Sequence, residues 1–432
     1  VSNNHYVLLF NCKCPKLFQT HSILADRYTY CKRSLLFFGI LIQCITPLHT
    51  IIFMIYFDTE SDSESFPFLF VDNCFIEEKN LMNIQEQIEQ NIITAIKGGL
   101  GEALVEKLFR KKILISGGAG FLGSWFCKVA IAHGAEVLCV DPLVASTKAN
   151  IKNLIEHPNF TFVNQSIETV DLPQRPADMV VHMASIASPP LYQQLPKTTY
   201  SAGVKGTERL LEYCSNHNST FLFTSTSEVY GNPADDDIPT SEDCASRVHS
   251  YGVRACYDIS KMTGETLCYM YKDEVDSRIA RIFNTYGPGI DTKSTSQYGR
   301  ALIKFIVQAL HNAPITIYGT GQQTRSFCYI TDQLVGLYKL LLVDNVDGPV
   351  NIGNDNEITI LELAQTIKEV AQSDSEIELD AQPAYDLTHD PNRRCPDLRK
   401  AGKIFDYTPQ VPLEYGLKET IEWTRANELA VV

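Results

Sequence analysis

The sequence has 432 residues, of which 20% are charged and 44% hydrophobic, and its 37 basic side chains face 51 acidic ones. A chain of this length can hold two or three domains, and its balanced composition excludes a disordered, collagen-like or disulfide-dense protein. The net charge of −14 argues against nucleic acid as the main partner, because phosphate binding needs a basic surface.

Residues 1–81 differ in composition from the rest of the chain. They hold 5 of the 13 Cys but only one of the 24 Gly. Within them, residues 34–57 carry no formal charge, and 24 residues are enough for a single transmembrane segment. Lys32 and Arg33 precede this run and acidic residues follow it, so such an anchor would keep the N-terminus in the cytosol.

Two interpretations of this first piece stay open. Either residues 34–57 anchor the protein in a membrane, or residues 1–81 are upstream sequence translated in frame, with Met82 the true start. The cysteines show neither disulfide nor zinc-site spacing, and those after residue 81 are typical of reduced core thiols. We therefore expect a cytoplasmic protein, or a single-pass membrane protein with a cytosolic N-terminus if the anchor is genuine. The ten His show no ligand spacing, so no metal site is expected.

An amphipathic helix is expected after this piece. Ile84, Ile88, Ile92 and Ile96 follow one another at intervals of four, which puts them on one helical face. We interpret residues 82–111 as a helical linker without chemistry.

A dinucleotide-binding motif follows the linker. An apolar strand leads directly to Gly117, Gly120 and Gly123, whose spacing allows a tight turn, close approach of a pyrophosphate and close helix–strand packing. A second strand, 136–140, ends in Asp141, whose carboxylate can accept both ribose hydroxyls and would repel a 2′-phosphate. The sequence therefore predicts that NAD is the cofactor. The residues expected to bind it are Gly117, Gly120, Phe121, Leu122, Gly123, Asp141, Ala184, Tyr257 and Lys261.

A catalytic motif is expected at the end of a later strand. The apolar run 219–224 leads to Thr226 and Glu228, and chemistry in open α/β sheets collects at the carboxyl ends of the strands. Downstream, Tyr257 and Lys261 are four residues apart and share one helical face. A lysine ammonium and a nicotinamide charge would lower the tyrosine pKa from about 10 toward neutrality, which makes it a base for a hydroxyl proton.

These motifs resemble the extended short-chain dehydrogenase/reductases, or NAD-dependent epimerase/dehydratase family, that modify nucleotide sugars. Within the family the chain is most similar to UDP-glucuronate decarboxylase (UDP-xylose synthase), a branch favoured by the RACYD and QTRSF stretches. The resemblance covers about 310 residues, from Ile113 to Trp423. Its motifs are GGAGFLG (117–123), HMASIASPP (182–190), STSEVYG (225–231), RACYDISK (254–261), ARIFNTYGPG (280–289), IYGTGQQTRSFCYITD (317–332), GPVNIGN (348–354), ITILELA (358–364) and RRCPDLRKAGKIF (393–405).

The resemblance implies roles for individual residues. Tyr257 would be the base, and Lys261 would orient the ribose and lower the pKa of that tyrosine. Thr226 would bind the sugar O4, with Ser227 and Glu228 beside C5. The implied substrate-binding residues are Asn284 and Arg394 at the diphosphate, Arg325 near the substrate carboxylate and phosphates, and Tyr318 near the uracil.

The chemistry of such an enzyme places independent demands on the site. Oxidation at C4 of a hexuronic acid puts a ketone β to the C6 carboxylate, so loss of CO2 leaves an enolate. Protonation at C5 and return of the hydride then give a pentose. The reaction needs a tightly held cofactor, a base at O4, a proton donor near C5 and cationic clamps. The catalytic candidates are Thr226, Ser227, Glu228 (directly or through a water it holds), Tyr257, Lys261 and Arg325, with Arg394 as a second clamp.

Other functions of the same superfamily stay open. A 4,6-dehydratase typically carries an Asp-Glu pair, whereas this chain has Ser227 before Glu228, although one dehydratase branch also has Ser-Glu. A 4-epimerase normally lacks this carboxylate. A non-catalytic NAD-sensing regulator would not need Tyr257 and Lys261 at their spacing.

Three positions depart from the family pattern. Ser166 stands where Asp usually contacts the adenine, Gly203 replaces a usual Asn, and Pro142 follows Asp141 where Asn is common. We expect these departures to weaken or reshape cofactor binding.

The expected architecture is α/β, a Rossmann-type doubly wound parallel sheet with a smaller, interleaved C-terminal lobe. Residues 112–280 would form mainly the NAD-binding domain and residues 281–425 mainly the nucleotide-sugar-binding lobe. The expected partners are a nucleotide sugar, UDP-glucuronate being favoured, and a second copy of the chain, since the family commonly forms dimers through the Tyr-Lys helix and its neighbour.

Overall fold

The structure is a computed structural model that describes residues 36–45, 50–58, 73–290, 301–383, 386–388 and 390–429. Side chains are described from residue 84 onward. The chain divides into two units, one of Val1–Gln87 with Arg425–Val432 and one of Ile88–Thr424.

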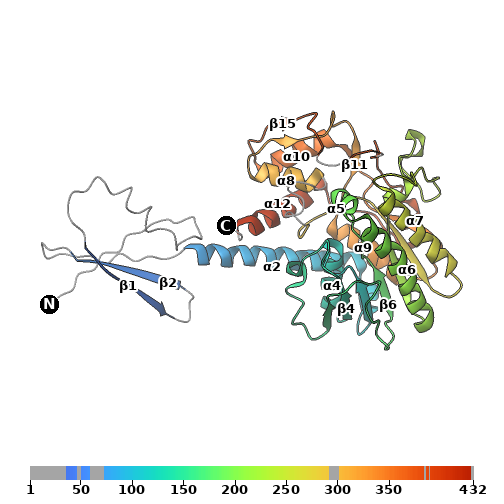
Figure 1. The fold of residues 1–432 in the computed structure, drawn as a ribbon, viewed down its shortest axis with the longest axis horizontal. Coiled ribbons are helices and arrows are strands. Elements are labelled where there is room, and N and C mark those ends of the chain that lie inside the picture. The colour runs from blue at the N-terminus through green and yellow to red at the C-terminus, as the bar shows by residue number, and fades with distance from the viewer. Residues whose placement is uncertain are drawn as a thin grey trace. The chain divides into compact units, whose positions relative to one another are not determined.

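The larger unit is built on a parallel sheet of seven strands in the order β13-β8-β7-β6-β3-β4-β5 (Figure 1). The chain runs from β3 outward to β5 and then crosses back to β6 on the other side of β3. This reversal is the point at which open α/β sheets bind ligands, and it confirms the predicted Rossmann-type fold. The strands are β3 Lys112–Ser116, β4 Glu136–Val140, β5 Phe160–Val163, β6 Met179–His182, β7 Thr220–Thr226, β8 Ser277–Ile282 and β13 Pro349–Ile352.

Helices cover both faces of this sheet because alternate strand residues point to opposite sides. Ile113 and Ile115 belong to the apolar cluster that contains α4 and α9, whereas Leu114 belongs to the cluster that contains α6 and α7. Each strand is thus buried on both sides, as its continuous apolar sequence indicates. The helices are α4 Phe121–Ala132, α5 Pro189–Gln194, α6 Pro196–His217, α7 Ala255–Met270 and α9 Ile330–Leu342, with 3₁₀ turns η1 Lys148–Ile151, η2 Ser227–Tyr230 and η3 Asp235–Asp237.

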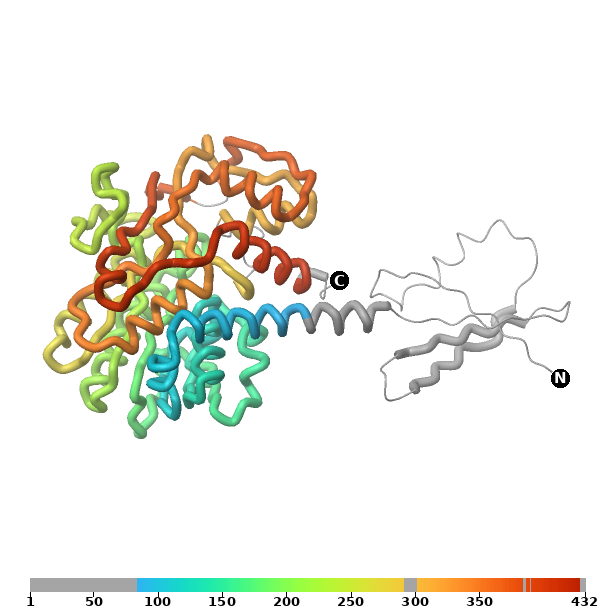
Figure 2. Tube along the Cα trace, turned by 180° about the vertical axis from the view of Figure 1, so that it is seen from behind, coloured from blue at the N-terminus to red at the C-terminus, as the bar shows by residue number. Residues whose placement is uncertain are grey.

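A second lobe is made of later segments, which gather beside the sheet in Figure 2 (yellow-orange to red). The lobe is interleaved with the first, because β13 and α9 return to the central sheet from within this part of the sequence. Its elements are α8 Ala301–Leu310, α10 Ile360–Ala371, α11 Arg399–Phe405, α12 Leu413–Leu429 and the strand pairs β9 Thr285–Tyr286 with β12 Cys328–Tyr329, β10 Ile315–Thr316 with β15 Ile377–Glu378, and β11 Thr324–Ser326 with β14 Glu357–Thr359.

The candidate membrane segment, residues 34–57, contains strands rather than a helix. β1 Leu36–Ile45 and β2 Thr50–Asp58 pair in antiparallel fashion, and residues 34–35 and 46–49 lie outside the described residues. Across the part of the chain that the structure describes, none of the helices combines the length and apolar character that a bilayer crossing requires. The cellular location stays a prediction.

Helix α2, Asn73–Leu100, occupies much of the expected linker, and α3, Glu102–Glu106, follows it. The structure buries Ile88, Ile92 and Ile96 of the predicted face in the main core cluster, whereas Ile84 is 43% exposed.

A buried ion pair also fastens α2 to α4. Lys128 Nζ on α4 lies 2.8 Å from Glu89 Oε2 on α2 and 4.4 Å from the Trp125 ring centroid. The C-terminal part of α2 is therefore part of the domain core and not a loose connection.

We predict that Ile96→Ala lowers the free energy of unfolding by about 2–4 kcal/mol, because it leaves a cavity between α2 and the core. Ile84→Ala is the matched control on the same helix and should change it by less than about 1 kcal/mol. Urea unfolding followed by circular dichroism measures both values. Equal effects of the two substitutions would contradict the packing of α2 on the domain.

Candidate active site

The loop between β3 and α4 needs glycine at two positions. Gly117 has a φ of +77°, and a Cβ there would collide with the backbone of Ala184, in the loop after β6. A Cβ on Gly123 would collide with the carbonyl of Gly117. The structure therefore brings together the predicted glycines and Ala184 at the switch point of the sheet.

The N-terminus of α4 is suited to a pyrophosphate. Its N-cap is Gly120, without a side-chain cap, and its first turn, which begins with Phe121 and Leu122, holds no acidic residue. A helix N-terminus with open N–H groups attracts an anion through its backbone dipoles. The residues present thus fit a dinucleotide.

Asp141 lies buried at the end of β4 and organises this loop. Its Oδ2 accepts a hydrogen bond from the Ala119 backbone N–H at 3.0 Å, and its Oδ1 accepts from Leu143 N–H and Ser146 Oγ at 2.8 and 2.7 Å. A carboxylate offers about four acceptor sites, so a ribose hydroxyl still finds one. Proline has no backbone N–H, but none of these contacts uses a donor at position 142, so Pro142 is compatible with them.

Tyr257 and Lys261 both lie buried on α7, beside β7. Lys261 Nζ donates to the Thr224 carbonyl at 2.6 Å and lies 5.0 Å from the Phe223 ring centroid. The ring of Tyr257 stacks on Tyr192, with centroids 5.4 Å apart. Burial lowers the pKa of Lys261 to about 7, against the opposing charge of Glu265.

The predicted residues at the end of β7 form a tight turn. Thr226 is the N-cap of η2, and its Oγ1 accepts from the Glu228 backbone N–H at 3.3 Å. Ser227 is buried, and its carbonyl accepts a hydrogen bond from Arg394. The turn thereby presents Thr226 and Glu228 at the same edge of the sheet.

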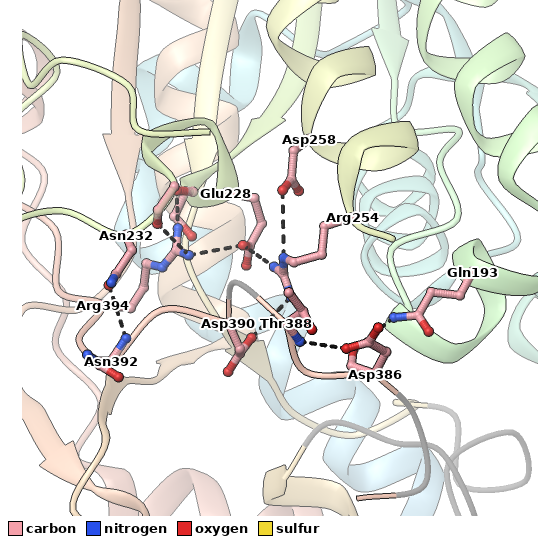
Figure 3. Close-up of polar contacts among 12 residues, drawn as sticks. Gln193, Glu228, Asn232, Arg254, Asp258, Asp386, Thr388, Asp390, Asn392 and Arg394 are labelled. Atoms are coloured by element: carbon pink, nitrogen blue, oxygen red, sulfur yellow. Dashed lines mark hydrogen bonds and ion pairs between the residues drawn. The ribbon is translucent and has the colours of Figure 1, made fainter. Parts of the chain in front are cut away.

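A charge cluster surrounds Glu228 (Figure 3). We use this name for Arg254, Arg325 and Arg394 with Glu228, Asp258 and Asp390. Glu228 forms ion pairs with Arg254 and with Arg394, the latter at 3.0 Å. Burial raises the pKa of the Glu228 carboxyl, but the three guanidinium groups lower it by more, to below its usual value. Glu228 is therefore ionised at neutral pH.

Two further carboxylates complete the cluster. Asp258 Oδ2 lies 3.6 Å from Arg254 Nε, while its Oδ1 is buried and has no hydrogen-bond partner among the residues that the structure describes. Burial and the charge of Glu228 raise the pKa of Asp258. Asp390 pairs with Arg325 at 2.8 Å and with Arg254 at 3.1 Å.

Sequence reasoning missed Arg254, Asp258 and Asp390. Arg254 and Asp258 flank Tyr257 within the RACYD stretch, so the motif carried a signal for them. Asp390 offers none that a single sequence reveals, because its partners are 65 and 136 residues away.

Of the remaining predicted substrate residues, Asn284 and Tyr318 have contacts outside the charge cluster, whereas Arg394 belongs to it. Asn284 Nδ2 donates to the Ser326 carbonyl at 3.3 Å, next to Arg325. Tyr318 follows β10 in the second lobe, where Lys304 Nζ lies 4.1 Å from its ring centroid. Arg394 donates to Ser227, Gly231 and Glu228, and these contacts hold the turn after β7.

Comparison with known proteins places this site in a family. Residues 113–353 match the NAD dependent epimerase/dehydratase family. The chain belongs to this family. UDP-glucuronic acid decarboxylase 1 of Danio rerio is 42% identical over 316 residues, which cover 73% of this chain and 72% of that protein. UDP-glucuronic acid decarboxylase 6 of Arabidopsis thaliana is 38% identical over 309 residues, covering 71% of this chain and 86% of its own length.

The fold of this chain is similar to the solved structures of two epimerases. UDP-glucuronic acid 4-epimerase of Bacillus cereus, in complex with UDP-glucuronic acid and NAD, is 26% identical and covers 74% of this chain and 99% of its own, with a TM-score of 0.64. UDP-glucose 4-epimerase of Thermotoga maritima, with UDP-glucose, is 25% identical over 73% of this chain and 99% of its own, with a TM-score of 0.65. The cofactor is NAD, which the glycine loop and α4 fit.

Two departures from the family pattern have local structural explanations. A Cβ at Gly203 on α6 would collide with Ser260 Oγ on α7, so Gly203 and Ser260 fit each other. Ser166 donates to the carboxylate of Glu168, which keeps a carboxylate just beyond β5. The effect of these positions on cofactor binding stays a prediction.

We predict that Gly203→Asn destabilises the protein by about 1–3 kcal/mol, because its side chain overpacks the contact between α6 and α7. Adding Ser260→Gly should restore most of the loss by making room for the Asn. Thermal unfolding and the NAD retained per chain measure the effect. A single variant as stable as the parent would show that the two helices are not in this contact.

Proposed function

We propose that this protein decarboxylates UDP-glucuronate to UDP-xylose, as an NAD-dependent carboxy-lyase. The observation that carries the proposal is an ionised Glu228, two residues after Thr226, enclosed by Arg254, Arg325 and Arg394 at the end of β7. The decarboxylases at about 40% identity support it, since the match spans most of each protein.

Tyr257 is the proposed base at the sugar O4. The glycine loop, Asp141 and the N-terminus of α4 would hold NAD, which would supply reversible hydride transfer at C4. Thr226 orients the O4 hydroxyl, and Tyr257 accepts its proton. Lys261 is held beside Tyr257 on α7 through its bond to Thr224, and its ammonium favours the tyrosinate.

Decarboxylation follows from the ketone at C4. The arginines orient the C6 carboxylate, and the enolate left by loss of CO2 takes a proton at C5. Because Glu228 is ionised, the proton comes through a water that Glu228 holds, with Ser227 beside it. Asn284 is proposed to contact the diphosphate and Tyr318 the uracil. Arg325 is proposed to lie near the substrate carboxylate and the phosphates, and the buried Arg394 fixes Glu228.

We expect purified protein incubated with UDP-glucuronate, without added NAD, to release CO2 and form UDP-xylose. Mass spectrometry of the nucleotide sugars and trapping of CO2 measure this. A 4-keto pentose would indicate that the final hydride return is missing. A C4 epimer without CO2 would identify an epimerase, and a 6-deoxy-4-keto hexose from another nucleotide sugar a dehydratase.

Tyr257→Phe is the matched variant for this assay. It removes the proton acceptor but keeps the ring that stacks on Tyr192, so turnover should fall at least about a hundredfold while NAD stays bound. Turnover within tenfold of the parent would contradict the assignment of the base.

A homodimer is proposed as the assembly. An open hollow on α6 and α7 exposes mainly apolar surface, and Tyr200 there is 43% exposed. Its lining residues are Pro196, Lys197, Tyr200, Ser201, Val204, Lys205 and Cys256. Apolar side chains of this kind on two neighbouring helices suit pairing with the same face of a second copy.

We expect light scattering after gel filtration to give twice the mass of one chain. Tyr200→Glu should shift the mass to one chain by placing a charge in the paired face, while Tyr251→Glu, at a 94% exposed site in the loop before α7, should leave it unchanged. A parent protein of single-chain mass would contradict the proposed dimer.

A further inference from the structure

Asp390 bridges two arginines of the charge cluster. Its Oδ2 lies 2.8 Å from Arg325 Nη2, and its Oδ1 lies 3.1 Å from Arg254 Nη1. A carboxylate of the chain thus fills guanidinium positions that an anionic ligand would use. Burial lowers the pKa of Arg325, and Asp390 is the carboxylate that opposes this most.

The position of this bridge indicates the sugar end of the substrate rather than the diphosphate. Arg254 contacts Glu228 through Nη2 and Asp390 through Nη1, so the two carboxylates lie on one guanidinium group. Glu228 comes two residues after Thr226, the residue proposed at O4. Arg254 thus separates the carboxylate of Asp390 from Glu228, which is proposed to lie beside the reacting carbons. A C6 carboxylate attached to those carbons would reach the same guanidinium group.

The guanidinium groups of the charge cluster are already occupied without a substrate. Arg254, Asp258 and Arg394 are buried, and Asp390 fills positions on Arg325 and Arg254. A substrate carboxylate cannot use those N–H donors while Asp390 holds them, and a second anion left unpaired beside them would be costly. Binding of that group to these two arginines therefore requires that Asp390 leaves.

Asp390 is the carboxylate most able to leave. Its side chain is 38% exposed, compared with 25% for Glu228 and 8% for Asp258. Glu228 and Asp258 belong to η2 and α7, whereas Asp390 lies in irregular backbone.

Polar contacts hold the backbone on either side of Asp390, and some of them are exposed to water (Figure 3). Gln193 Nε2 donates to the Asp386 carbonyl at 3.1 Å, and the Asn392 backbone N–H donates to Asn232 Oδ1 at 3.1 Å. The Asn392 carbonyl also accepts from the Thr324 N–H at 3.1 Å and from Arg325 Nη1 at 3.2 Å. Because these contacts hold backbone atoms, the exposed Asp390 side chain can turn away from the arginines while the rest of the cluster stays in place.

We infer that Asp390 is a surrogate for the substrate carboxylate, which displaces it from Arg325 and Arg254 when the nucleotide sugar binds. The inference rests on the proposed function, because only a uronic acid substrate carries this carboxylate. Loss of CO2 removes the competing anion, and Asp390 returns to the arginines. Asp390 thus weakens binding of the charged substrate selectively and leaves binding of the neutral-sugar product unchanged.

Titration calorimetry on Tyr257→Phe protein, in which substrate is not turned over, tests this inference. Adding Asp390→Asn should tighten UDP-glucuronate about tenfold, since charge-assisted hydrogen bonds to the arginines no longer have to be broken. Binding of UDP-xylose and of UDP should change less than about twofold. Asp390→Glu keeps the charge and should leave all three affinities near those of the parent.

The matched control is Asp386→Asn. It removes one negative charge four residues before Asp390, from a carboxylate that accepts a bond from the Thr388 backbone N–H. It should leave UDP-glucuronate binding within about twofold of the parent. Asp390→Ser serves as a second neutral variant where Asp390→Asn unfolds.

Each alternative result identifies a different error. Weaker binding of UDP-glucuronate to the neutral variants would make Asp390 a positioning residue for the arginines and overturn the inference. Equal tightening of UDP would place Asp390 against the diphosphate and overturn it as well. A Tyr257→Phe parent that binds UDP-xylose and UDP but not UDP-glucuronate, together with no CO2 release by the unmodified protein, would instead overturn the proposed function.

Discussion

The pairing of Glu228 with Arg254 and Arg394 is the interaction on which the rest of the site depends. Glu228 lies in the turn after β7, Arg254 immediately precedes α7, and Arg394 comes from the second lobe. The carboxylate therefore joins the sheet, the helix of Tyr257 and Lys261, and the lobe proposed to hold the nucleotide sugar. Removing one member would leave a buried charge without a partner, which typically costs about 3–5 kcal/mol. The cluster holds its geometry because each charge in it requires the others.

The cofactor-binding part of the site, the loop between β3 and α4, depends instead on the absence of side chains. Gly117 and Gly123 leave space where any Cβ would meet backbone, and α4 begins with open N–H groups. Asp141 links this loop to the end of β4 through Ala119 and Leu143. The two halves meet through α7, whose Lys261 bonds to β7 two residues before Thr226.

The sequence allowed prediction of those parts of the protein whose physical cause is local. The glycine loop, the strand-end Asp141 and the four-residue spacing of Tyr257 and Lys261 are each contained in a short stretch, and the sheet follows from them. The charge cluster is different, since Glu228 meets Arg254 across 26 residues and Arg394 across 166. An apolar run also does not distinguish a helix from strands, and within residues 34–57, one of whose two open interpretations is a membrane segment, the structure has β1 and β2. The presence of glycine at position 203 is explained only by the fold, which packs Ser260 against it.

The pairing of guanidinium groups with carboxylates in the cluster also determines how this acidic chain can select an anionic sugar. The whole sequence carries a net charge of −14, and each guanidinium group of the cluster already faces a carboxylate. An approaching nucleotide sugar therefore meets little net positive field, and long-range steering contributes little to its capture. Selection acts at contact distance instead, where bidentate guanidinium groups distinguish a planar carboxylate from a hydroxyl. A site of this kind gains specificity by exchanging one carboxylate for another, since exchange conserves the buried charge while the identity of the anion changes.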